Sequence, residues 1–378
     1  MQKSVRCLLV AVLVLLSGFS CRKNDGVPPV DDSVRMPVLF GSNLLSNVST
    51  RGAGALPEWN GTQSLYIYGL RRVDGKYVLP AGTDPYAEDD ENAYLIRNVR
   101  AMSPSSGATG SIHVYRTGTE YFYYRESTYY DFYGYYSDDA AGAAPAPTET
   151  AGTITLDVTV DGSQDVMLAH TDRAADAAAA TSTVDVERVY GAYAARRNVK
   201  PNLIFDHMLS RFNFRLKAGN AATAANVTVE SLKVYSKSRG TLTIASNVET
   251  SPRGIVPDAA QEPVAMTLTG GSGAITQAGD IFGNPLMVMP GAETYEVELV
   301  IKQGDYTVND GKVTQKMVID FSKIKPSVPG GTTDTRAVSG HQYDVTIIVY
   351  GLEKVEIDVT MSSWDGDHGS FEIDPDEL

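Results

Sequence analysis

The sequence is poor in cysteine. Only two of its 378 residues are cysteines, Cys7 and Cys21. Cys7 lies within an N-terminal apolar run that we expect to be removed, which leaves one cysteine and excludes an intrachain disulfide. The fold therefore has to be stabilised by side-chain packing.

Positive charge is also scarce. The chain has 46 Asp and Glu residues against 32 Lys and Arg, and its formal net charge is −14 at pH 7. Loss of Lys3 and Arg6 with the N-terminal run takes the net charge to −16. We find no basic patch that would neutralise phosphates, so we expect no nucleic-acid partner. The acidity is typical of a soluble, exposed protein.

Motifs for catalysis and metal binding are missing. His207 has no Gly-x-Ser-x-Gly or cysteine nucleophile beside it in the sequence, so we interpret it as structural. The acidic stretch 84–92 does not have the spacing of an EF-hand loop, and Asp365, Asp367 and His368 lie on a terminal tail without supporting groups. We predict no catalytic residues, no metal site, no cofactor and no enzymatic activity.

The two-residue period of β-strands is what the chain has in abundance. Residues 340–364 form two alternating arms around a short polar turn, which predicts a β-hairpin with one buried face. Two strands alone are marginal in water, so this hairpin needs a partner sheet. Val, Thr, Tyr and Gly are abundant and long helical periodicities are absent, which favours an all-β class.

Further strands are predicted on both sides of the middle of the chain. Asp74-Gly75 gives the turn of a hairpin, and residues 153–160 and 203–217 each read as one alternating strand. The alanine-rich stretch that follows His170 is interpreted as a loop insertion with a helical turn or two. The second half continues with strands at 227–235, 240–244, 264–268, 282–289, 295–302 and 316–321, a spacing typical of a β-sandwich.

Residues 115–136 are dense in tyrosine, and two interpretations are open. Tyrosine offers a large, rigid contact area with a polar tip, so Tyr129 and Tyr133 could form an adhesive surface for a sugar or a protein. The alternative, which we favour, is two or three strands whose rings pack on both faces of a sheet.

The N-terminus is typical of an exported lipoprotein. Lys3 and Arg6 precede the apolar run 8–16, which is too short to span a membrane, and the run leads into Cys21. We expect residues 1–20 to be a signal peptide and Cys21 to be acylated, with palmitate among its chains. The alternative is a plain signal peptide followed by an incidental cysteine.

A cleavable segment follows the signal. Residues 22–35 are polar and contain proline, which indicates a tether, and residues 36–48 have strand character. Arg51 lies between that strand and the small-residue run that begins at Gly52, where a trypsin-like protease has access. On its own this signal is weak, because most exposed arginines are merely solvated.

Several segments, taken in order, resemble the fimbrillin family, the pilins and accessory subunits of type V pili in Bacteroidales. The resemblance covers most of the chain. It rests on the lipoprotein-like start and on residues 129–136, 164–169, 205–214 and 343–364.

The resemblance implies two transthyretin-like Greek-key β-sandwich domains in tandem. It also implies that an arginine-specific surface protease cuts between Arg51 and Gly52 and removes the first strand, and that a C-terminal strand of another subunit fills the gap. Arg35 is an alternative cleavage site that would leave the strand in place. The candidate donor residues are Phe371 and Ile373. The expected segments are 1–20 signal peptide, 21–51 tether and removable strand, 52–202 N-terminal sandwich, 203–364 C-terminal sandwich and 365–378 tail.

The function implied is that of a fimbrial subunit in cell adhesion. Its expected location is the outer membrane and the fimbrium, and its expected partners are other fimbrial subunits, the outer membrane through the lipid anchor, the protease, and a host protein or glycan. An alternative from a different functional class is that the protein is a surface glycan-binding lipoprotein that does not polymerise.

Overall fold

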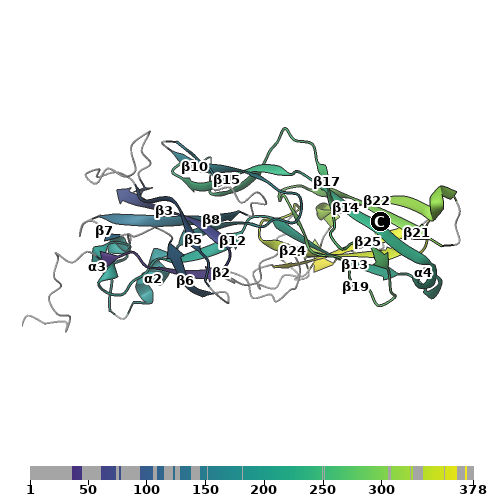
Figure 1. The fold of residues 1–378 in the computed structure, drawn as a ribbon, viewed down its shortest axis with the longest axis horizontal. Helices are drawn as coiled ribbons and strands as arrows, with labels where there is room; N and C mark the ends of the chain where they lie inside the picture. Colours follow the sequence, from purple (N-terminus) through teal and green to yellow (C-terminus); the bar gives the residue numbers. More distant parts are fainter. Residues whose placement is uncertain are drawn as a thin grey trace, which may run out of the picture. The chain divides into compact units, whose positions relative to one another are not determined.

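The structure is a computed structural model in which most of the chain after residue 35 is described (Figure 1). The described residues are 36–44, 61–73, 76–77, 94–104, 109–114, 122–123, 128–137, 145–150, 152–180, 182–248, 250, 252–304, 308–323, 325–326, 335–352, 354–363 and 371–372. Met36–Leu378 forms one compact unit. Its described residues form six β-sheets and a few short helices, which confirms the all-β class. Two sandwich domains are compatible with these sheets, and that division stays a prediction.

The first large sheet has eight strands and closes on itself. Its order is β4-β3-β5-β6-β2-β12-β11-β8, and β8 also pairs with β3. All its pairs are antiparallel except β2 with β12. The strands are β2 (Phe40–Leu44), β3 (Ser64–Val73), β4 (Lys76–Tyr77), β5 (Tyr94–Met102), β6 (Thr109–Val114), β8 (Tyr129–Ser137), β11 (Val166–Thr171) and β12 (Asn202–His207).

Short elements accompany this sheet. β1 (Met36–Pro37) pairs with β7 (Phe122–Tyr123). Helix α2 (Arg173–Ala178) begins after Asp172, whose side chain accepts hydrogen bonds from two backbone amides of the first turn. It is followed by η1 (Val186–Arg188) and α3 (Ala192–Ala195).

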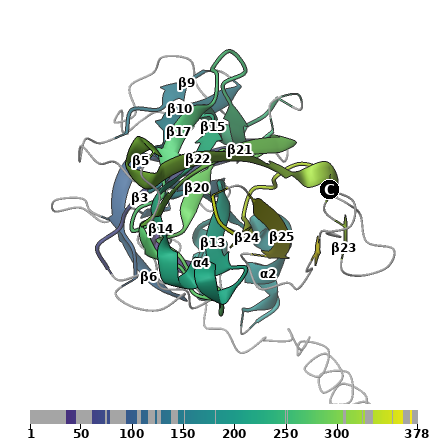
Figure 2. The same ribbon diagram turned by 90° about the vertical axis from the view of Figure 1, so that its right-hand side faces the viewer.

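Two five-stranded sheets form a sandwich in the second half of the chain, with strands of both sheets visible in Figure 2. One has the order β19-β13-β24-β25, with β20 also on β13, and the other has β17-β14-β21-β22, with β18 also on β14. The strands are β13 (Ser210–Ala218), β14 (Val227–Ser236), β17 (Val264–Thr267), β18 (Gly273–Ala274), β19 (Asp280–Ile281), β20 (Leu286–Val288), β21 (Thr294–Gln303), β22 (Lys312–Asp320), β24 (His341–Val349) and β25 (Val355–Ser363). Helices α4 (Ala221–Asn226), η2 (Val308–Gly311) and η3 (Phe321–Lys323) connect them.

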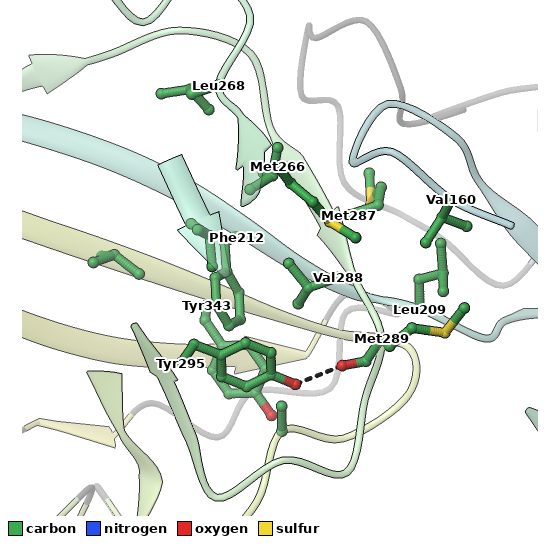
Figure 3. Packing of buried hydrophobic residues seen from close by; sticks show 14 of the residues in the cluster. Val160, Leu209, Phe212, Met266, Leu268, Met287, Val288, Met289, Tyr295 and Tyr343 are labelled. Atoms are coloured by element: carbon green, nitrogen blue, oxygen red, sulfur yellow. Dashed lines mark hydrogen bonds between the residues drawn. The ribbon is translucent and has the colours of Figure 1, made fainter. Parts of the chain in front are cut away.

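Aromatic rings fill the centre of this sandwich (Figure 3). The Phe212 ring on β13 meets Tyr343 on β24 edge-on at 5.6 Å and Tyr295 on β21 at 5.1 Å between centroids. The Tyr295 hydroxyl donates a hydrogen bond to the Met289 carbonyl at 2.5 Å. The two sheets are therefore joined through a buried apolar core in which the Tyr295 hydroxyl has a hydrogen-bond partner.

A four-stranded sheet draws on both halves of the chain. Its order is β16-β15-β10-β9, from β9 (Thr148–Glu149), β10 (Thr153–Thr159), β15 (Arg239–Ser246) and β16 (Gly254–Pro257). Glu149 connects it to the first sheet, because its carboxylate accepts hydrogen bonds from Tyr94 at 2.7 Å, Tyr68 at 3.0 Å and Arg97 at 2.9 Å. A last small sheet pairs β23 (Lys325–Pro326) with β26 (Phe371–Glu372).

Both predicted hairpins are confirmed, and one predicted strand is wrong. β3 and β4 pair around residues 74–75, and β24 and β25 pair along their whole length. Residues 203–217, however, hold two strands, because the chain leaves the first sheet after His207 and enters the sandwich at Ser210. The alanine-rich stretch contains the short helix α2, as expected.

We predict that the protein loses stability in alkali. Below pH 10.0, the ordinary pKa of tyrosine, folded and unfolded chains both keep their tyrosines neutral. Above it the unfolded chain ionises first, so the free energy of unfolding falls as the pH rises. The urea concentration at the midpoint of unfolding should be lower at about pH 11 than at about pH 8. The Tyr295→Phe variant should show a smaller difference between the two pH values than wild type does. Equal midpoints would contradict the prediction. Burial raises the pKa of Tyr68, Tyr123, Tyr135, Tyr190 and Tyr295.

Candidate assembly site

Strand β2 occupies the position that closes the first sheet. It pairs with β6 on one side, where Phe40 faces Ile112, and with β12 on the other, where Gly41 faces Asn202. In the sheet order β2 is the only link between β6 and β12 among the described strands. Without it, both neighbours would present unpaired backbone donors and acceptors.

The side chains that lead into β2 are anchored in the core. Val38 and Phe40 are buried, while Leu39 between them is 51% exposed. The Phe40 ring meets Phe132 edge-on, with centroids 5.0 Å apart and an interplanar angle of 84°. Phe132 in turn contacts Tyr190. Removing the segment would take two buried apolar side chains out of the core, each worth about 1.5–3 kcal/mol, and would expose the apolar groups they cover, so the gap favours a replacement strand.

The predicted processing residues lie outside the described part of the chain. These are Cys21, Arg51 and Gly52, and their roles stay predictions. The donor residue Ile373 also lies outside it. Phe371 is in β26, where it faces Pro326 of β23, and its donor role stays a prediction.

Tyr129 and Tyr133 are half-buried and take part in internal contacts. Arg188 Nε donates a hydrogen bond to the Tyr129 hydroxyl at 3.3 Å. The Arg253 guanidinium lies 4.9 Å from the Tyr133 ring centroid and donates to the Ala169 carbonyl at 2.6 Å. Other rings of β8 pack in both hydrophobic cores, Tyr135 in one and Phe132 in the other. An adhesive role for Tyr129 and Tyr133 stays a prediction.

His207 lies in a buried polar cluster at the break between β12 and β13. Its Nδ1 is 3.0 Å from Asp165 Oδ2, and both side chains are fully buried. Arg211 is buried nearby, and burial lowers its pKa to about 10, against the pull of Asp165 and Asp344. Arg211 Nε donates to Asn213 Oδ1 at 3.3 Å. The sequence analysis missed Asp165 and Arg211, since only the fold brings residues 42 positions apart together.

The described residues give no sign of a metal centre or a membrane-spanning helix. No three of their His, Cys, Asp and Glu side chains are grouped to bind a metal ion. None of their helices has the length and apolar character needed to cross a membrane.

The sequence profile of fimbrillin-like proteins matches residues 82–364, about three quarters of the chain. The chain belongs to the fimbrillin-like family. The match begins after β2, so it does not include the closing strand of this fimbrillin-like fold. No curated protein matches the chain.

Similar solved structures come from Bacteroides and Porphyromonas species. A candidate cell adhesion protein from Bacteroides uniformis is 16% identical over 87% of this chain and 99% of its own, with a TM-score of 0.47. A fimbrial protein from Bacteroides vulgatus is 10% identical over 88% of this chain and 100% of its own, with a TM-score of 0.43. The tip fimbrial protein Mfa3 from Porphyromonas gingivalis, truncated at its C-terminus, is 9% identical over 88% and 100%, with a TM-score of 0.39.

We predict that Phe40→Ala destabilises the uncleaved protein by about 3–5 kcal/mol, because it empties a buried ring site. Leu39→Ala is the matched control, since it alters the neighbouring, half-exposed side chain. Urea unfolding of both variants measures the difference in the free energy of unfolding. Equal losses would show that this segment does not anchor the first core.

Proposed function

We propose that the protein is a structural subunit of a type V fimbrium, exported as a lipoprotein and assembled by donor-strand exchange. The observation that carries the proposal is the place of β2, a short N-terminal strand that alone joins β6 to β12 among the described strands. Membership of the fimbrillin-like family supports the same function. The protein acts as a building block, and adhesion follows from assembly.

Cleavage is the switch in this proposal. Acylated Cys21 holds the precursor at the outer membrane. An arginine-specific protease then cuts between Arg51 and Gly52, which separates β1 and β2 from the rest of the chain. The gap exposes two strand edges and the core behind Phe40, and both drive the capture of a new strand.

The C-terminal tail of another copy supplies that strand. Residues 365–378 are fourteen residues long and span roughly 45 Å when extended, whereas the five residues of β2 span roughly 16 Å. Phe371 and Ile373 are two residues apart, so they lie on one face of a strand and replace the buried side chains of the removed segment. Pro375 has no amide hydrogen to donate and belongs outside the gap.

We predict that Arg51→Ala yields a folded, lipidated monomer that does not polymerise. Its β2 stays covalently attached, so the gap never opens. Arg35→Ala is the control, because cutting at Arg35 would leave β2 in place, and this variant should polymerise like wild type. Mass spectrometry of the surface protein gives the first residue, and gel ladders give the polymer.

A wild-type surface protein that begins at Gly52 and forms ladders agrees with the proposal. An Arg51→Ala variant that forms ladders as wild type does would overturn it. A protein that retains acylated Cys21 in the assembled fimbrium would instead be an anchor.

A further inference from the structure

The structure gathers positive charge at one place on this acidic protein. Between Arg188 and Lys200 the sequence has four basic residues and no acidic one. The Tyr193 ring lies between two guanidinium groups, 3.6 Å from Arg188 and 3.8 Å from Arg197. We call Arg188, Tyr193, Arg196, Arg197 and Lys200 the cationic patch. The sequence analysis found no basic patch, which was wrong for this surface.

The patch is accessible, and the neighbouring carboxylate is engaged elsewhere. Lys200 is exposed, and Arg196 and Arg197 are partly exposed. The Glu187 carboxylate, next to Arg188 in sequence, lies 3.6 Å from Arg173. Within the described residues Lys200 makes no ion pair. The patch is therefore able to attract an anionic partner.

The patch lies at one end of the gap that β2 fills. Helix α3, which carries Tyr193, contacts β1, the strand just before β2 (Figure 1 labels α3 and β7, the partner of β1). Lys200 comes two residues before Asn202, which faces Gly41 at the start of β2. A strand placed between β6 and β12 therefore has one of its ends beside the patch.

The proposed donor has the opposite charge. Residues 365–378 contain six acidic residues and no Lys or Arg. Three of the acids, Asp374, Asp376 and Glu377, lie in the four residues that follow Ile373. Before Phe371 there are only Asp365 and Asp367, and His368 stands beside them. The denser negative charge is at the distal end of the tail.

We propose that the cationic patch receives the distal acidic end of the C-terminal tail of a second copy. This fixes the direction of insertion. β2 runs parallel to β12 and starts beside the patch, so a donor that ends beside the patch runs antiparallel to β12. The inference rests on the proposed donor-strand exchange and adds the residues that select the partner and orient it.

Charge reversal tests the pairing. Arg196→Glu with Arg197→Glu reverses the patch, and Asp374→Lys with Asp376→Lys reverses the tail. After cleavage at Arg51, each should polymerise about tenfold more slowly than wild type at low salt, because steering is lost. A chain with both reversals should polymerise at close to the wild-type rate. The differences in rate between variants and wild type should shrink at about 1 M salt, which screens the charges. Lys200→Glu alone, which leaves the Tyr193 contacts intact, should also slow assembly.

Arg215→Glu with Lys217→Glu is the matched control, since it makes the same charge change at two exposed residues of β13 in the sandwich. A patch variant no slower than this control would overturn the inference and leave donor-strand exchange standing. A cleaved wild-type protein that never polymerises would overturn both.

Cysteine pairs test the direction. The cleaved chain has no cysteine, because Cys7 and Cys21 precede Arg51. Lys200→Cys in one copy and Asp376→Cys in another should form an intermolecular disulfide in the polymer, whereas Lys200→Cys and Asp367→Cys should not. The reverse pattern would show insertion parallel to β12 and would overturn the proposed direction.

Discussion

Backbone hydrogen bonding at β2 is the constraint on which the first sheet depends. A strand between two others satisfies donors and acceptors on both of its edges, and in this sheet β2 does so for β6 and β12 with five residues. Phe40 adds an edge-on contact with Phe132. One short segment therefore provides both backbone pairing and core burial. A sheet without it would have unpaired backbone groups and uncovered apolar side chains at the same place.

The same region is coupled to the second half of the chain. β12, the parallel partner of β2, continues after two residues into β13 of the sandwich. At that break His207 pairs with Asp165 in full burial, and Arg211 lies close by. Buried charges are costly unless paired, so this cluster favours one arrangement of the break over alternatives. The β12 edge that pairs with β2 is thus continuous with groups that lie outside the N-terminal segment.

Alternation of apolar and polar residues, together with a polar or Asp-Gly turn between the two arms, was sufficient to predict both hairpins from the sequence. It failed at residues 203–217, where both strands alternate and no Gly or Pro marks the break at Met208 and Leu209. The contacts of Glu149 with Tyr68, Tyr94 and Arg97 could not be predicted, since only the fold brings together residues more than 50 positions apart. The cationic patch was missed because the net negative charge of the whole chain concealed a stretch of thirteen residues with four positive charges and no negative one.

In the proposed donor-strand exchange, a replacement strand needs contacts outside the gap. Inside it, the backbone of any strand can pair with β6 and β12, and any two suitably spaced apolar side chains can refill the core, so the gap alone distinguishes poorly between donors and between the two directions of insertion. β2 itself accepts a parallel and an antiparallel neighbour at once. Specificity therefore has to come from groups at the ends of the gap. The described chain offers such groups beside α3, where positive charge meets the end of the gap at which β2 begins.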